Sequence, residues 1–117
     1  MQTRFWLALA CTVGLAAPAV AQSALGNLSG CERVNGTMES SDDVFILWPD
    51  RIERWESTCT ITNVTGDLNL RAILMTECYG EGEMWPQDYG ITPVGTEMFA
   101  IWPLEYPEAI FELRMCG

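Results

Sequence analysis

The sequence predicts an all-β, mainly antiparallel domain: a small disulfide-stabilised meander that closes toward a barrel or a sandwich. Short apolar runs rich in β-branched and aromatic residues are separated by Gly, Pro, Asn and Asp, which is typical of strands and turns. Six prolines, mostly at the ends of these runs, argue against long helices. Five cysteines in a chain of only 117 residues indicate cross-links that reinforce a small core.

The first 21 residues have the pattern of a secretory signal peptide. Arg4 precedes an apolar stretch, and Ala19-Val20-Ala21 forms an A-x-A cleavage site. The apolar stretch is shorter than the roughly 20 residues that a membrane-spanning helix requires. We therefore expect one periplasmic or secreted domain, residues 22–117, with no membrane span in its mature form.

Two predicted elements precede the first long strand. Residues 22–43 are rich in Ser, Gly, Asn and Asp, and we expect a loose N-terminal arm that is held only at Cys31. Residues 44–48 form a compact apolar strand, which Pro49-Asp50 ends, and residues 51–56 follow as the second arm of a hairpin.

The centre of the chain predicts a longer hairpin. Residues 55–62 alternate with period two, and Gly66-Asp67 interrupts them, so we expect a turn around residues 65–69. The run 68–79 is expected to return as a strand, although a helix over 68–77 is the best alternative. One face of this strand should carry Leu70, Ala72, Leu74, Thr76 and Cys78.

The last third of the sequence predicts two more strands after a turn at residues 80–83. Residues 85–95 contain two prolines, and we expect a looser stretch there. Residues 98–102 form an apolar strand that Pro103 ends. Residues 109–116 form the final strand, and one of its faces should carry Phe111, Leu113 and Met115.

Four cysteines remain after the signal peptide, which removes Cys11, and we expect them to form two disulfides. They are Cys31, Cys59, Cys78 and Cys116. Zinc sites place cysteines in close pairs, whereas these are far apart and no His is present. Three pairings are possible from the sequence. We favour Cys31–Cys59 with Cys78–Cys116, because each bond then ties a terminal segment to a central strand.

The charge of the chain excludes several classes of function. It has 16 acidic residues, six Arg, no Lys and no His, a net charge of −10 that becomes −11 without the signal peptide and its Arg4. Such a chain offers no basic surface for nucleic acid. Without His no Ser-His-Asp triad can form, and without Lys no Schiff base can form. We therefore expect no enzyme, and we assign no catalytic, cofactor-binding or metal-binding residue.

Carboxylate chemistry is the main catalytic alternative that the composition leaves open. Several acidic residues lie near Trp85 and Tyr89, and aromatic side chains stack on sugars; these acids are Glu77, Glu81, Glu83 and Asp88. A solvated acidic rim explains the same cluster more simply. The oxygen-rich strings 40–43 and 81–83 lack EF-hand spacing, so we do not expect a calcium site.

The sequence alone does not show whether the arginines form ion pairs or how many aromatic side chains are exposed. We expect Arg51, Arg54 and Arg71 to form cross-strand ion pairs with neighbouring acids. Most of the ten aromatic residues that follow the signal peptide should lie in the core, but two or three tryptophans exposed on one face would indicate a binding surface for protein or glycan.

Two strings resemble a known group of proteins. Residues 55–61 read W-x-S-x-C-x-I, residues 78–85 read C-x-G-E-G-x-x-W, and Cys116 stands next to the last residue. These features resemble small exported four-cysteine β proteins of alphaproteobacteria. The resemblance implies a β-rich fold and export but no activity. The segment 85–107 departs from that group, so no strand pairing is carried over there.

These observations favour an exported, non-enzymatic binding or envelope-associated protein. An acidic surface suits a basic protein or an envelope protein as the partner, because opposite charges steer association. The alternatives are a small carboxylate-based enzyme that acts on glycans and a protein that resembles protease or lysozyme inhibitors. A cleft that holds a carboxyl of raised pKa beside Trp85 would favour the enzyme.

Overall fold

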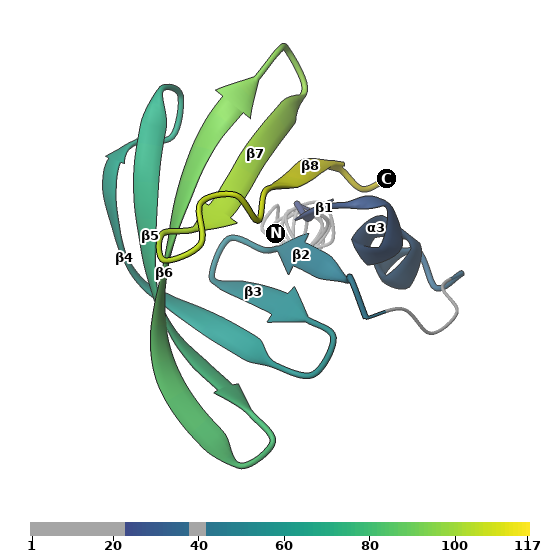
Figure 1. Ribbon diagram of the computed structural model, residues 1–117. Coiled ribbons are helices and arrows are strands. Elements are labelled where there is room, and N and C mark those ends of the chain that lie inside the picture. The colour runs from purple at the N-terminus through teal and green to yellow at the C-terminus, as the bar shows by residue number, and fades with distance from the viewer. Residues whose placement is uncertain (1–22, 38–41) are drawn as a thin grey trace, which may run out of the picture.

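Eight antiparallel strands form a closed barrel in which every strand pairs with its neighbours in sequence and β1 pairs with β8 (Figure 1). This computed structural model describes residues 23–37 and 42–117, so the predicted signal peptide lies outside the described residues. The elements are β1 (Leu25–Gly26), α3 (Leu28–Val34), β2 (Phe45–Leu47), β3 (Arg51–Arg54), β4 (Thr58–Asp67), β5 (Arg71–Gly80), β6 (Glu83–Val94), β7 (Met98–Pro103) and β8 (Phe111–Met115). The predicted all-β antiparallel meander is confirmed, and it closes as a barrel.

The barrel interior is filled by side chains that alternate along the strands. β5 shows the alternation most clearly, since every second residue is buried and the others are exposed. This pattern confirms a strand rather than a helix, although Leu70 lies in the preceding turn and is exposed. The buried core consists of Phe45, Ile52, Cys59, Ala72, Leu74, Cys78, Tyr89, Ile91, Ile101 and Leu113. Of the three residues expected to share a face of β8, Leu113 is buried and Phe111 packs on the core, whereas Met115 is exposed.

The N-terminal segment is better ordered than the sequence predicted. The expectation of a loose arm is wrong for residues 25–34, where the short strand β1 leads into helix α3. The Asn27 side chain caps this helix by accepting hydrogen bonds from the backbone N–H groups of Gly30 (2.8 Å) and Phe45 (3.1 Å). Asn27 therefore joins the start of α3 to β2.

Helix α3 covers the outer face of β1 and β2 and forms a second, smaller core with them (Figure 1). Ala24, Val44, Ile46 and Cys116 are buried there, with Cys31, Val34 and Trp48 packed against them. The helix lies so close to β2 that a Cβ atom on Gly30 would fall 2.2 Å from the Phe45 carbonyl oxygen. Only glycine, which has no Cβ, therefore fits at that position.

Both disulfides form, but with a pairing different from the one we favoured. Cys31 bonds Cys116, and Cys59 bonds Cys78. The β4–β5 hairpin places Cys59 directly opposite Cys78, so these two cysteines face each other across adjacent strands. β8 pairs with β1, which carries Cys116 toward the start of α3 and Cys31. The expected pairing ignored this contact between the two ends of the chain.

The stretch 85–95, expected to be loose, is part of the twelve-residue strand β6. Pro86 pairs with β5 alone, because β7 begins its pairing only at Tyr89. Pro93 pairs with β7 alone, because the pairing with β5 ends at Ile91. Each proline therefore lies where β6 pairs with only one strand. Because no second strand pairs with β6 there, the missing N–H of proline removes no hydrogen bond on that side.

The two disulfides should contribute unequally to stability. Cys31–Cys116 spans 85 residues and Cys59–Cys78 spans 19. In the chain-entropy account, the first bond stabilises by about 4.5 kcal/mol and the second by about 3 kcal/mol. We expect the double variant Cys31→Ala/Cys116→Ala to lose more free energy of unfolding in urea than Cys59→Ala/Cys78→Ala. The reverse order would contradict this assignment.

Tryptic digestion under non-reducing conditions provides a direct control. Cleavage after Arg33, Arg54, Arg71 and Arg114 places the four cysteines in separate peptides. We expect one linked pair that contains Cys31 and Cys116 and another that contains Cys59 and Cys78. A peptide that links Cys31 to Cys59 would contradict the connectivity.

Candidate functional site

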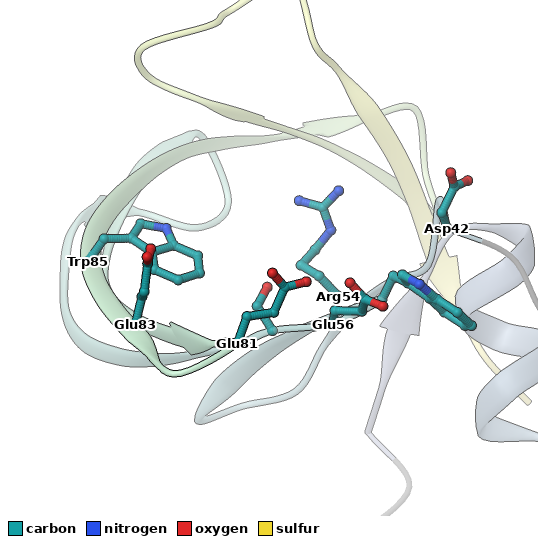
Figure 2. Close-up of a pocket in the computed structure, with 9 residues that line it drawn as sticks. Asp42, Arg54, Glu56, Glu81, Glu83 and Trp85 are labelled. Atoms are coloured by element: carbon teal, nitrogen blue, oxygen red, sulfur yellow. The ribbon is translucent and has the colours of Figure 1, made fainter.

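An acidic hollow of about 400 Å³ lies at the end of the barrel where β3 turns into β4 and β5 turns into β6 (Figure 2). It combines carboxylates, one guanidinium and two indoles. The lining residues are Asp42, Arg54, Trp55, Glu56, Ser57, Gly80, Glu81, Glu83 and Trp85. We call this set the acidic hollow.

The register of β5 and β6 determines which side chains face the hollow. Trp85 lies opposite the inward-facing Cys78, and Glu83 lies opposite Gly80, so both continue the inner face of the barrel. Figure 2 shows Glu83 beside the Trp85 ring on this strand. The hollow is therefore the inner face of the β5–β6 hairpin at the point where the hairpin extends beyond the barrel.

Close packing of the two turns brings their acidic residues together. A Cβ atom on Gly80 would lie 2.5 Å from the backbone oxygen of Glu56, so only glycine allows this approach. The next residues, Glu81 and Gly82, form the two-residue turn with φ angles of 53° and 80°. The left-handed conformation suits Gly82 but costs an ordinary L-residue such as Glu81 about 1–2 kcal/mol.

Glu56 and Glu81 form a pair of carboxyl groups in contact. Their side chains share a hydrogen bond, and Figure 2 shows the two carboxyl groups side by side. The hydrogen bond to Glu81 raises the pKa of Glu56, and the negative charge of Glu81 raises it further, whereas a hydrogen bond with Trp55 lowers it. The pair is open to solvent, so a ligand can reach it without any rearrangement.

Arg54 belongs to the hollow but does not neutralise it. Its guanidinium lies 4.8 Å from the Phe45 ring centroid and 4.7 Å from that of Phe111, and its Nε donates a 3.1 Å hydrogen bond to the Val44 carbonyl. Among the described residues, no carboxylate lies within 4.0 Å of this guanidinium. This half-buried cation therefore lies over two aromatic rings at the edge of the hollow, and within residues 23–37 and 42–117 the acids of the hollow have no basic partner within 4 Å.

The structure brings together only part of the acidic cluster that the sequence suggested. Glu81, Glu83 and Trp85 meet in the hollow, whereas Glu77 is exposed on the outer face of β5. Tyr89 is a core residue whose ring packs edge-on against Phe45, 5.7 Å between centroids. No group of three or more potential ligands is placed to hold a metal within residues 23–37 and 42–117, and Ser40 and Ser41 lie outside this part.

Sequence reasoning missed the half of the hollow that the β3–β4 turn provides. Arg54, Trp55 and Glu56 were not assigned to a site with Glu81, because only the strand register shows that the two turns are neighbours. The signal that could have identified them is the separation of Cys59 and Cys78. If these two pair across a hairpin, the residues just before Cys59 and just after Cys78 must lie side by side.

The cross-strand ion pairs predicted for Arg51, Arg54 and Arg71 do not form among the described residues, and none of the four tryptophans in this part of the chain is fully buried. Arg51 pairs with Asp50 (2.9 Å) and Glu53 (3.4 Å) on its own strand and turn, and Arg71 stacks on the Trp102 ring at 5.2 Å. Trp48 and Trp102 are half-buried. The other two tryptophans, both in the hollow, are the more exposed: Trp55 at 38% and Trp85 at 36%.

Replacing Glu81 should change the titration of Glu56. In Glu81→Gln, the repulsion disappears and the amide can donate to the Glu56 carboxylate, so the pKa of Glu56 should fall toward its ordinary value. NMR titration of the Glu56 carboxyl carbon measures this change. Glu83→Gln is the matched control, since it removes a charge from the same hollow but keeps the Glu56–Glu81 contact. An equal effect of both variants would contradict the pairing.

The same pair predicts a pH-dependent effect on stability. The pKa of Glu56 is higher in the folded protein than in the unfolded chain, so protonation of Glu56 favours the folded state. This contribution to the free energy of unfolding is fully present below the unfolded pKa and is lost as the pH rises through the folded pKa. Glu81→Gln should therefore raise the Tm relative to the parent protein at neutral pH, and the difference should shrink in acid. A Tm difference that grows in acid would contradict this linkage.

Comparison with protein-family models, with curated proteins and with solved structures finds no match to this chain. Within the described residues, no helix has the length and apolar character needed to cross a membrane. The disulfides are typical of an oxidising compartment outside the cytoplasm.

Proposed function

We propose that this protein is an exported, non-enzymatic binding protein whose acidic hollow receives a cationic side chain of a basic protein partner in the periplasm or outside the cell. The carrying observation is the Glu56–Glu81 carboxyl pair, which is open to solvent within a hollow that also holds two half-exposed tryptophans. Carboxylates bind guanidinium and ammonium groups through charge-assisted hydrogen bonds, and indole faces attract the same cations.

The electrostatics of the pair favour a cationic ligand. Two carboxyl groups in contact repel each other when both are ionised, so they share a proton more readily than either would alone. A bound cation offsets the repulsion between the two ionised carboxylates. Binding therefore relieves a charge conflict that the fold itself creates.

The net charge of the chain supports the same class of partner. At −11 without the signal peptide, the domain attracts basic proteins over a distance and accelerates their encounter. The hollow then provides the specific contact, because it concentrates Asp42, Glu56, Glu81 and Glu83 around two indoles. An inhibitor of a basic secreted enzyme is one form that such a protein can take.

A matched pair of double variants separates specific contact from general attraction. Glu56→Gln/Glu81→Gln removes the carboxyl pair, and Glu77→Gln/Glu112→Gln removes two exposed acids elsewhere on the barrel. Both variants have the same net charge. With an oligoarginine peptide as the probe in calorimetry, the first variant should bind about tenfold more weakly, ~1.4 kcal/mol, and the second almost as well as the parent protein. Equal losses would overturn the proposed site.

Glycan hydrolysis is the second candidate, and the raised pKa of Glu56 in a hollow with Trp85 favours it. Glycosidases hold their two carboxyl groups about 5 Å or more apart, because a sugar ring or a water molecule must fit between them. Glu56 and Glu81 are in direct hydrogen-bonding contact, which leaves no such space. Binding of a cation is therefore the better explanation of this pair.

Incubation with cell-wall glycan distinguishes the two functions. We expect the oxidised protein to release no reducing ends from peptidoglycan, with lysozyme as the positive control. Release that disappears in Glu56→Gln would establish the enzyme and contradict the binding proposal.

A further inference from the structure

The β5–β6 hairpin extends past the neighbouring strands at the end of the barrel that carries the acidic hollow (Figure 1). β7 pairs with β6 only from Tyr89 onward, so residues 83–88 of β6 have a neighbouring strand on one side alone. Residues 83–86 are all exposed, although a barrel strand normally buries every second residue. We call residues 76–88 the projecting hairpin, and both of its faces are open near the turn.

The projecting hairpin carries large apolar side chains on both faces. Tyr79 and Met84 lie directly opposite each other in the ladder and are 59% and 69% exposed. Trp85 lies opposite the inward-facing Cys78, so its indole is on the other face, in the acidic hollow. Exposed apolar side chains of this size indicate an interaction surface, and Tyr, Trp and Met are enriched in protein–protein interfaces.

The charge of the projecting hairpin is entirely negative. Its sequence contains Glu77, Glu81, Glu83 and Asp88 but no Arg. Glu81 is in the turn and Glu83 begins β6, so the part that reaches furthest from the barrel is acidic. A surface of this charge fits a positively charged partner.

The free edge of β6 is poorly suited to pairing with another strand. The Leu104 N–H donates to the Asp88 carbonyl (3.0 Å) on the side of β7, and the main-chain groups of an antiparallel strand point alternately to its two sides. Pro86 therefore points its main chain to the same, unpaired side, where it has no N–H to donate. The side chains of the projecting hairpin are thus better suited than its edge to recognise a partner.

The projecting hairpin is held in place on its other side. β4 pairs with β5 as far as Thr58 and Tyr79, and the Cys59–Cys78 disulfide joins the same two strands one residue further in. An element that is already fixed in one conformation loses little conformational entropy on binding. The hairpin can therefore enter a partner without first becoming ordered.

We propose that the projecting hairpin inserts into a positively charged groove of a folded basic protein, which then contacts both faces of the hairpin. A flat partner surface covers only one face and leaves the apolar side chains of the other face in water. The walls of the groove supply apolar side chains to the two faces, and its floor supplies Arg or Lys to Glu81 and Glu83. This inference rests on the proposed function, because it extends the contact at the acidic hollow to the opposite face of the same hairpin.

Site-specific photo-cross-linking in the natural host tests both faces. The full-length chain is expressed with p-benzoylphenylalanine in place of Met84 on the outer face, of Trp85 on the inner face, or of Leu70 as the control. Leu70 is 71% exposed and lies in the β4–β5 turn, which is at the opposite end of the barrel because sequential strands run alternately up and down. We expect positions 84 and 85 to form an adduct with the same basic protein, at sites on facing walls of one groove, and position 70 to form none.

Binding to that protein, once purified, measures the contribution of the outer face. Tyr79→Ser/Met84→Ser leaves the carboxylates of the acidic hollow and the net charge unchanged, and we expect it to bind about tenfold more weakly than the parent protein. Leu68→Ser/Leu70→Ser is the matched control, because it removes two exposed apolar side chains from the opposite end of the barrel. This control should bind as the parent protein does. Thermal unfolding of each variant confirms that the barrel is intact.

Several results would overturn the inference. An adduct at position 85 alone means that the partner contacts the hollow without the outer face, and it leaves the proposed function intact. The inference also fails if position 84 forms no adduct, if position 70 forms an equal one, if the captured protein is acidic, or if Tyr79→Ser/Met84→Ser binds undiminished. Conversely, undiminished adducts at positions 84 and 85 in Glu56→Gln/Glu81→Gln would exclude the carboxyl pair as the binding site while insertion of the hairpin stands.

Discussion

The closure of the barrel depends on a seam with only two residue pairs, Leu25 with Met115 and Gly26 with Arg114. So short a ladder is a weak join between the two ends of a chain. The Cys31–Cys116 disulfide reinforces it from outside, lying over Gly26, where a Cβ atom would come within 3.0 Å of the Cys116 sulfur. Helix α3 holds Cys31 in place, and the Asn27 cap holds the helix on β2. The enclosed interior of the barrel requires this closure.

The two ends of the barrel have opposite chemical character, and strand length explains the difference. At one end the β5–β6 hairpin extends past the short strand β3, so its inner face leaves the core and carries Glu83 and Trp85 into solvent. At the other end the inner face keeps its aliphatic side chains up to the turns. One continuous inner surface therefore changes from acidic to apolar along the axis of the barrel.

The sequence was sufficient for the fold class, because period-two alternation in β5 and prolines at the ends of apolar runs are local signals. It was insufficient where a long-range contact decides the outcome. The pairing of Cys31 with Cys116 follows from β1 meeting β8, and the meeting of Glu56 with Glu81 follows from the neighbouring turns. The two prolines of β6 misled the prediction, since they were counted as strand breakers although each lies beside an unpaired edge. Local sequence patterns predict the strands, whereas only the pairing of the strands shows which residues meet in the acidic hollow.

The turn at Glu81 and Gly82 combines two features that lower stability. A two-residue turn of this kind strongly prefers Asn or Gly at its first position, because an ordinary side chain there is strained. A chain optimised for folding alone would carry Asn-Gly at this point and would also avoid a carboxylate beside Glu56. Glutamate at this position therefore carries two costs to stability, one in backbone conformation and one in charge repulsion with Glu56.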